Sequence, residues 1–285
     1  MNYYDTNGVL REAKGSQDRF FQFIYAHALT RALLKPLVKP GFSRFAGKIM
    51  DSGFSRVFIR SFIRKNGIDM KDFEERKFRS FNDFFTRKVK PEARPIPTAE
   101  NLLFSPCDAY LTAVPVEEGL RFTIKHTEYT LPEFLKDEAL AKSFEGGTVL
   151  LFRLAVQHYH RYHFTDNGKI VREYRIPGFL HTVQPSANEA VSVYKQNARA
   201  VTIMETEHFG TVVQTEVGAL LVGRIKNRPV REFVRAEEKG MFEFGGSTVV
   251  MILKKDAVRL RPGILKASEE KIEHEVRFGT VLGET

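Results

Sequence analysis

The sequence predicts an α+β fold, in which a helical N-terminal region (residues 1–86) precedes a mostly antiparallel β domain (residues 87–285). Three observations lead to this prediction. Apolar residues recur at three- and four-residue steps from residue 17 to about residue 85, which is the period of an amphipathic helix. Residues 87–101, RKVKPEARPIPTAEN, are rich in proline and charge and are expected to form a linker. Short β-type runs such as GTVLLFRL, TVVQTEVGALLVGRI and STVVMILKK follow, separated by glycine, proline and asparagine turns.

Two stretches of the N-terminal region have the helical period. The first covers residues 19–38, and Pro36 and Pro40 stop it. The second covers residues 51–69 and alternates apolar with basic residues. Its apolar residues are Phe54, Val57, Phe58, Phe62 and Ile63, and its basic residues are Arg56, Arg60, Arg64 and Lys65. Either these helices pack on a core, or residues 17–65 form a basic amphipathic surface that rests on anionic lipid.

Composition narrows the class of protein. The formal net charge is +9 and the pI is about 9.5, so the chain suits a polyanionic partner, either nucleic acid or an anionic membrane surface. Cys107 is the only cysteine, which rules out an internal disulfide and a cysteine-rich zinc site. No secretory signal is evident, and no run approaches the roughly 20 apolar residues of a membrane-spanning helix. We therefore expect a protein that is soluble or lies on a membrane.

The stretch FEFGGSTVVMIL, residues 242–253, reads as a strand interrupted near its start by two glycines directly before Ser247. Glycine tolerates distorted dihedrals and adds little bulk, so the peptide bond before the serine is open to attack. A β-bulge is the competing interpretation, because Gly-Gly before a strand is a common bulge signature.

Two further segments hold residues that could carry chemistry. SPCDAY places Asp108 just after a proline turn, where it could be a simple turn aspartate. VQHYHRYHF contains His158 and His160, which would share one face of an extended strand, and His163, which would take the other. A zinc site is disfavoured because no cysteine and no nearby carboxylate offers a further ligand. Read together with Ser247, an aspartate and a histidine complete a nucleophile, base and orienter arrangement.

Six blocks of sequence, in a fixed order, resemble one known family. The blocks are FNDFFTRKVKPEARPI, SPCDA, YHRYHF, RIPGFLHTVQP, TEVGALLVGRI and EKGMFEFGGSTVV. They resemble the phosphatidylserine decarboxylase proenzymes, which make their own pyruvoyl group. The resemblance is firm from about residue 81 to residue 253.

The resemblance implies a role for each candidate residue. Ser247 would be the self-processing serine, His163 its general base, and Asp108 the carboxylate that orients that base. His160 would act in the decarboxylation step, near the substrate carboxylate. Ser247 would attack the carbonyl of Gly246, and the two glycines would keep that bond open to attack.

By the same resemblance the chain is cut between residues 246 and 247, and the two pieces stay together through strand pairing. The pyruvoyl group formed at Ser247 would draw electrons from the breaking Cα–carboxylate bond, so no metal and no exogenous cofactor is expected. The expected partners are phosphatidylserine and an anionic membrane surface, with no nucleic acid. The family also suggests a homodimer and a peripheral position at the cytoplasmic face of a membrane.

The sequence departs from the family pattern at two places, and two other functions are considered. Ala109 stands where the family usually has glycine. His158 and Val156 stand where it often has an acidic residue and a proline, so His158 is given no role. A serine hydrolase would use the same aspartate, histidine and serine, but Val249 replaces the second glycine of its G-x-S-x-G pattern. A catalytically silent lipid-binding relative is the other alternative, motivated by Ala109.

Overall fold

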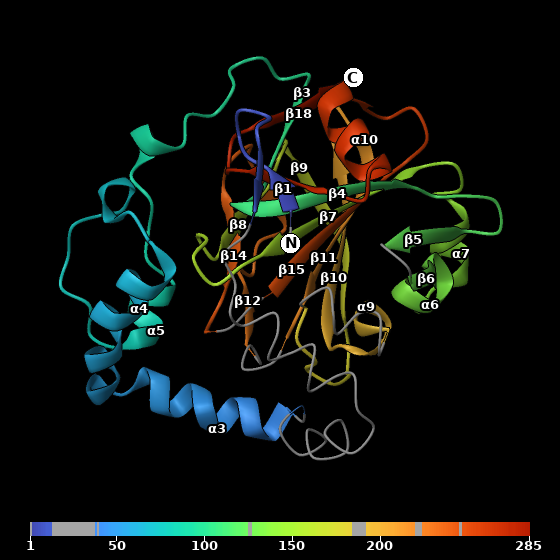
Figure 1. The fold of residues 1–285 in the computed structure, drawn as a ribbon. Helices are drawn as coiled ribbons and strands as arrows, with labels where there is room; N and C mark the ends of the chain where they lie inside the picture. The colour runs from blue at the N-terminus through green and yellow to red at the C-terminus, as the bar shows by residue number, and fades with distance from the viewer. Residues whose placement is uncertain are drawn as a thin grey trace.

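The computed structural model of the chain describes residues 2–12, 38, 40–124, 127–183, 192–219, 224–244 and 247–285. A ten-stranded sheet forms the body of the molecule, and three smaller sheets and several short helices surround it (Figure 1). Strand pairing is antiparallel in nearly every case, and the longest helices belong to the N-terminal part. The α+β prediction is therefore confirmed.

The large sheet joins strands from the whole length of the chain. In spatial order its strands are β13 (Glu232–Phe233), β9 (Gly168–Ile176), β10 (Arg199–Thr206), β11 (Gly210–Val217), β15 (Ser247–Leu253), β7 (Thr148–Leu154), β4 (Ala109–Pro115), β17 (Glu273–Val276), β1 (Asn2–Tyr4) and β2 (Leu10–Glu12). All neighbours are antiparallel except β1 and β17.

The smaller sheets and the helices complete the described part of the chain. The sheets are β12 (Ile225–Asn227), β14 (Glu238–Phe242) and β8 (Arg161–His163); β16 (Arg259–Leu260), β18 (Val281–Glu284) and β3 (Leu102–Phe104); and β5 (Arg121–Ile124) with β6 (Thr127–Thr130). The α-helices are α3 (Pro40–Asp51), α4 (Ile59–Asn66), α5 (Phe81–Phe85), α6 (Leu131–Leu135), α7 (Glu138–Lys142), α9 (Val193–Gln196) and α10 (Pro262–Glu269). The 3₁₀ helices are η1 (Gly53–Phe58), η2 (Met70–Asp72) and η3 (Pro91–Ala93).

Strand β15 is buried on both faces, which explains its unbroken apolar run. Successive side chains of a strand point to opposite faces. Val250 and Ile252 accordingly join the core that includes residues of α6, α7 and α9. Val249 and Met251 join the core on the other face, where Tyr162 of β8 and other residues of the small β12–β14–β8 sheet pack.

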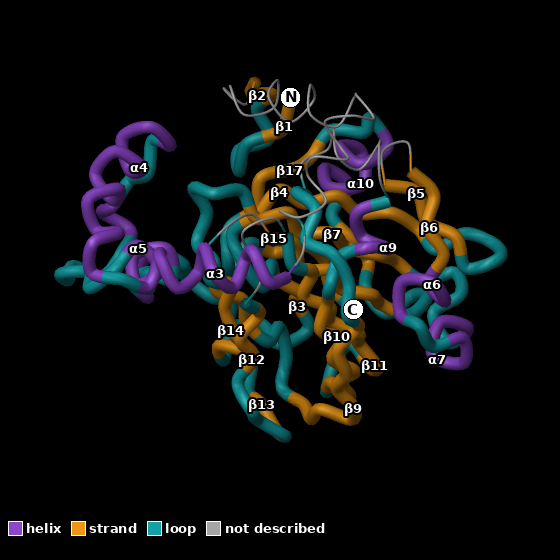
Figure 2. The backbone as a smooth tube through the Cα atoms, turned by 90° about the horizontal axis from the view of Figure 1, so that it is seen from below, coloured by secondary structure: helices purple, strands orange, loops and turns teal. Residues whose placement is uncertain are grey.

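The helices α3, η1, α4 and α5 form an arm, in which α4 and α5 stand to one side of the sheets in both views (Figures 1 and 2) and α3 runs below the sheets in Figure 1. The short helix α5 fastens this arm to the body. Its phenylalanines Phe81, Phe84 and Phe85 are buried with Tyr159, which lies next to β8. Ser80 caps α5, because its hydroxyl accepts the backbone N–H of Asp83.

The observed structure differs from the expected helical region of residues 1–86 at its first residues. Residues 2–4 and 10–12 are strands, and β1 lies beside β17 at the edge of the large sheet. The helix predicted over residues 19–38 falls almost entirely outside the described residues. The helix predicted within residues 51–69 is present as η1 followed by α4.

The expected linker, residues 87–101, is attached to the body and is not a free tether. It contains η3, and its Arg87 and Arg94 are buried, with 0% and 6% of their surface exposed. The division of the chain at residue 87 stays a prediction.

The stretch FEFGGSTVVMIL belongs to two strands, and these lie in two different sheets. Strand β14 ends at Phe242 in the small sheet, and β15 begins at Ser247 in the large one. Gly245 and Gly246 lie outside the described residues, so the predicted bulge does too. Within the described ranges no helix has the length and apolar character of a membrane span.

Candidate active site

Ser247 is the first residue of β15 and is wholly buried, with 0% of its surface exposed. It pairs with Leu154, the last residue of β7. Because side chains alternate along a strand, Ser247 shares a face with Val249, on the side covered by β8 and β14. Its hydroxyl has no hydrogen-bond partner among the residues that the structure describes. A buried hydroxyl without a hydrogen bond is unfavourable and calls for an explanation, such as a role in chemistry or a bound ligand.

His163 is the last residue of β8, an edge strand of the small β12–β14–β8 sheet. Its backbone N–H donates to the carbonyl of Pro106 at 3.0 Å, and its Nδ1 lies 3.1 Å from the same oxygen. A carbonyl oxygen only accepts, so Nδ1 carries the ring proton and Nε2 keeps its lone pair. This is the tautomer that a general base requires.

The His163 ring lies between two aromatic rings. Phe278 stacks on it with ring centroids 3.8 Å apart and an interplanar angle of 14°, and Tyr159 is nearly parallel to it at 5.9 Å. Burial lowers the pKa of His163 to about 4, although the Pro106 carbonyl and nearby carboxylates oppose the shift. The imidazole is therefore neutral at pH 7.

Asp108 is buried, and its carboxylate is engaged by other groups. The guanidinium of Arg94 donates two hydrogen bonds to it, at 3.0 and 2.7 Å, and the backbone N–H of Phe278 donates a third at 2.8 Å. In the described part of the chain no hydrogen bond joins Asp108 to His163. The link is indirect, because Phe278 binds Asp108 through its N–H and stacks on His163 with its ring.

His160 lies directly before β8 and is fully buried. Its Nδ1 lies 2.9 Å from the carbonyl oxygen of His158, so Nδ1 carries the proton and Nε2 the lone pair. That Nε2 has no partner among the described residues. The ring packs on Phe85 of the arm, with centroids 4.0 Å apart, and burial lowers its pKa to about 3.

His158, which was given no role, closes the turn between β7 and β8. Its Nδ1 accepts the backbone N–H of Ala155 at 3.1 Å, and its own N–H donates to the Ala155 carbonyl at 2.9 Å. Burial lowers its pKa to about 3. The side chain of His158 thus stabilises the turn that places His160.

The block FNDFFTRKVKPEARPI supplies three residues that frame the site and that sequence reasoning did not single out. Asn82 accepts the N–H of Phe244 at 3.0 Å. Arg87 donates to the carbonyls of Gln157 and His158, at 3.0 and 3.4 Å. Arg94 binds Asp108, and its Nη1 also binds Asp72 of η2 at 2.8 Å. Their place in a matched block was the available signal, whereas nothing in the sequence pointed to Phe278.

A buried ion pair ties the small sheet to the large one. Lys239 of β14 donates to both carboxylate oxygens of Glu216 of β11, at 2.8 and 2.9 Å, and both side chains are almost fully buried. Asn227 donates to the same carboxylate and accepts the hydroxyl of Tyr162. The sheet that carries His163 is therefore fixed over β15 by polar as well as apolar contacts.

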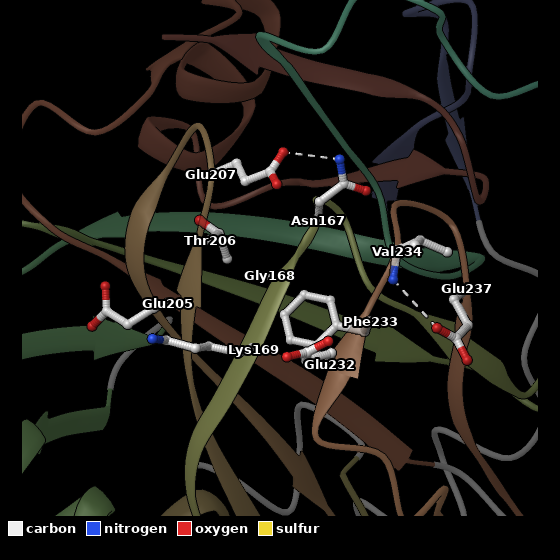
Figure 3. A pocket seen from close by; sticks show the side chains of 10 residues that line it. All are labelled: Asn167, Gly168, Lys169, Glu205, Thr206, Glu207, Glu232, Phe233, Val234 and Glu237. Atoms are coloured by element: carbon white, nitrogen blue, oxygen red, sulfur yellow. Dashed lines mark hydrogen bonds between the residues drawn. The ribbon is translucent and has the colours of Figure 1, made fainter.

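A cavity of about 660 Å³ lies apart from these residues, between β9, β13 and the turn after β10 (Figure 3). Carboxylates dominate its lining, which includes Glu205, Glu207, Glu232 and Glu237 beside a single lysine, Lys169. Such a lining repels an anionic headgroup. We therefore place the candidate site at Ser247 and not in this cavity.

Comparisons with known proteins point to one family. A family described as phosphatidylserine decarboxylase matches residues 81–284. A "Phosphatidylserine decarboxylase proenzyme 2" of Clostridium acetobutylicum is 39% identical over 265 residues, covering 93% of this chain and 91% of the relative. A "Phosphatidylserine decarboxylase proenzyme" of Ruminiclostridium cellulolyticum is 38% identical over 274 residues, covering 93% and 91%. One of Clostridium perfringens is 36% identical over 274 residues, covering 93% and 92%.

The three buried histidines predict how stability depends on pH. In the unfolded chain they take up protons near pH 6.5, whereas in the folded chain they stay neutral down to about pH 4 or 3. The full contribution of these histidines to the stability of the fold is therefore present above pH 6.5 and is lost as the pH falls. Each of the three histidines should lower the free energy of unfolding by about 2 kcal/mol when the pH falls from 8 to 5.

Thermal unfolding of the wild type, His160→Gln and His208→Gln at a series of pH values checks this. The acid sensitivity of His160→Gln should be weaker than that of the wild type. His208 is a control of opposite sign, because its hydrogen bond to Asp166 raises its pKa. His208→Gln should therefore be the more acid-sensitive variant. Equal pH dependence in the wild type and His160→Gln would contradict the assignment of a buried, neutral His160.

Proposed function

Because the chain belongs to the phosphatidylserine decarboxylase family, we propose that this decarboxylase uses a pyruvoyl group that it makes from its own Ser247. The observation that carries the proposal is the setting of Ser247. Its buried hydroxyl has no partner among the described residues, and it faces the small sheet in which His163 presents an unprotonated Nε2.

The self-processing step follows from these two residues. Nε2 of His163 takes the hydroxyl proton, and Oγ of Ser247 adds to the carbonyl carbon of Gly246. The C–N bond then breaks, so the acyl group moves from nitrogen to oxygen and leaves an ester with a free α-amine. Loss of the Cα proton and cleavage of the Cβ–O bond release Gly246 as a carboxylate. The dehydroalanine that remains tautomerises to an imine, and water replaces its nitrogen, which leaves as ammonia.

Asp108 is proposed to support His163 indirectly, through other residues. The carboxylate of Asp108 accepts the backbone N–H of Phe278, and the ring of Phe278 stacks on the imidazole of His163. Asp108 also lies two residues after Pro106, whose carbonyl fixes the tautomer of His163. The charge of Asp108 also favours the imidazolium that forms when His163 takes the proton. Arg94 keeps the carboxylate in place, so Asp108 need not touch the base.

The surroundings fit a small carbonyl group at position 247. The site is buried, and the Nε2 lone pair of His160 has no partner among the described residues. When present, the pyruvoyl group supplies an electron sink for the bond to the substrate carboxylate. His160 would take the proton that the substrate ammonium group must lose, and would return it to the carbon that carbon dioxide leaves. A neutral imidazole with a free Nε2 can do both.

Cleavage before Ser247 is compatible with an intact fold. In the chain as described, β15 lies between β11 and β7, β17 lies between β1 and β4, and β18 lies between β16 and β3. Strands β15 and β17 would thus remain held on both sides by strands of residues 1–246, and β18 would be held on one side by β3. The serine hydrolase alternative gains no support, because such enzymes expose their serine on a strand-to-helix turn and Ser247 is buried in a central strand.

A membrane contact through the arm is also proposed. Three apolar side chains of η1 are largely exposed, namely Phe54 (73%), Val57 (62%) and Phe58 (47%). Further exposed apolar residues on α3 are Phe42, Phe45 and Ile49. Arg56, Arg60 and Arg64 of the same segment are exposed as well. An apolar patch with basic residues between suits the interface of an anionic bilayer, where the acyl chains of phosphatidylserine stay. Action at the cytoplasmic face and a homodimer remain predictions.

The first test concerns self-processing. Ser247→Ala removes the hydroxyl that starts the acyl shift, so intact-mass measurement should find one uncut, inactive chain. Ser247→Thr keeps a hydroxyl and should cut slowly. The wild type should give two chains, the smaller with a blocked N-terminus. Efficient cutting of Ser247→Ala at the same bond would overturn the proposal.

A second test separates the two histidines. His163→Ala should accumulate the uncut chain, because loss of a general base typically slows a reaction about 10²–10⁴-fold. His160→Ala should cut at least in part but decarboxylate poorly. Gel analysis of cutting and carbon dioxide release per cut molecule distinguish the two outcomes. Normal decarboxylation by fully cut His160→Ala protein would remove His160 from the mechanism.

The third test concerns the membrane contact. Replacing Arg56, Arg60 and Arg64 together by glutamine removes about 1 kcal/mol of attraction each, so binding to anionic vesicles should weaken roughly a hundredfold at low salt. Phe54→Ser should also weaken co-sedimentation and leave the melting temperature unchanged, because its ring is exposed. Phe179→Ser is the control, since Phe179 is also an exposed phenylalanine (47%) but lies outside the arm. Unchanged binding of the arm variants with an intact fold would exclude this segment as the contact.

A further inference from the structure

Asn82 of α5 uses both ends of its side-chain amide in the buried junction between the arm and the body. Its Oδ1 accepts the backbone N–H of Phe244 at 3.0 Å, and its Nδ2 donates to Oδ1 of Asp51, the last residue of α3, at 2.7 Å. Asn82 is 5% exposed. An amide held at both ends in this way has one orientation, because the reverse orientation would leave donor facing donor.

Phe244 is held by its ring as well as by its N–H. The ring lies edge-on to Phe81 at 5.0 Å and to Phe85 at 5.5 Å, and Phe85 in turn packs on His160. The neighbouring residue, Glu243, forms ion pairs with Arg224 and Lys226, and Arg224 also pairs with Asp51. Helices α3 and α5 therefore both hold the chain at residues 243–244.

Phe244 lies close in sequence to the proposed cleavage site. Phe244 stands three residues before Ser247, and the bond proposed to break is the one between residues 246 and 247. Pairing with β7 and β11 holds the chain from Ser247 and Thr248 onward. Asn82 holds it on the other side of the scissile bond.

We propose that Asn82 is a positioning residue for self-cleavage, because it anchors the chain just before the bond that Ser247 attacks. The inference rests on the proposed function, since it takes the cut between residues 246 and 247 as given. Attack on a carbonyl depends steeply on alignment, and a misplacement of about 1 Å can slow a reaction about 10²-fold. Loss of the Asn82 anchor should slow the acyl shift itself, which is the step that forms the ester.

The experiment follows the cutting of freshly translated chains with time, by gel and intact mass, at a temperature well below the melting temperature of every variant. Asn82→Ala should cut at least tenfold more slowly than the wild type. Asn66→Ala is the matched control, because Asn66 lies on the same arm and, within the described ranges, its amide donates to the carbonyl of Phe62 alone. It should cut at the wild-type rate.

A swap of donor and acceptor separates positioning from general stability. Asn82→Asp keeps an acceptor for the N–H of Phe244 but sets a carboxylate against Asp51, so it should also cut slowly. Adding Asp51→Asn restores a donor opposite that carboxylate, and the double variant should recover most of the wild-type rate. Hydroxylamine, which cleaves esters, should not release the small chain from Asn82→Ala, because the ester does not accumulate.

Each other outcome overturns the inference. A wild-type rate for Asn82→Ala excludes a positioning role. Rates that follow melting temperature across all variants, with no recovery in the double variant, reduce Asn82 to a structural residue. Rapid cleavage of Asn82→Ala by hydroxylamine would move its effect to the later elimination step. A wild-type chain that is never cut before Ser247 would overturn the proposed function itself, and this inference with it.

Discussion

The central position of β15 is the constraint on which the rest of the structure depends. The strand pairs along its whole length with β7 and from Thr248 onward with β11, and all seven of its residues are buried. Because Ser247 begins this strand, the chain must pass from the small sheet to the large one just before it. That passage places a potential cleavage point at the border of two sheets, where a cut separates no paired strands. The same passage brings β8 and its histidine over the face of β15 that Ser247 shares.

Burial then decides the protonation states of the site. His160 and His163 are almost fully removed from water, which holds both imidazoles neutral at pH 7. Backbone carbonyls, those of His158 and Pro106, fix the tautomers, and no carboxylate contacts either ring nitrogen in the described part of the chain. Asp108 is instead paired with Arg94. A pKa of about 4 would make His163 a weak base, so the proposed processing would rely on alignment more than on basicity.

Periodicity in the sequence was enough to predict the class of fold and several of its strands. The runs around β7, β11 and β15 are continuous and apolar because both faces of these strands are buried, and α4 has a clear helical period. Strand β1 was not predictable, because a strand of three residues is too short to show a period. The blocks of sequence singled out Ser247, His163, His160 and Asp108 as candidates, but they did not show how these residues are held. Pairings such as Phe278 with Asp108 join residues far apart in the chain, and the fold alone brings them together.

The arm joins the proposed membrane contact to the proposed site through one small hydrophobic cluster. Phe54 and Phe58 are exposed on η1, while Phe62 of the following helix packs edge-on against Phe81 and Phe84. Phe81 and Phe85 contact Phe244, and Phe85 contacts His160. A lipid substrate keeps its tails in the bilayer while its headgroup reacts, so an enzyme that acts on it needs its interfacial surface close to its catalytic groups. The short, phenylalanine-rich helices of the proposed contact would meet that need, because their outer residues face solvent and their inner residues reach His160 and Phe244.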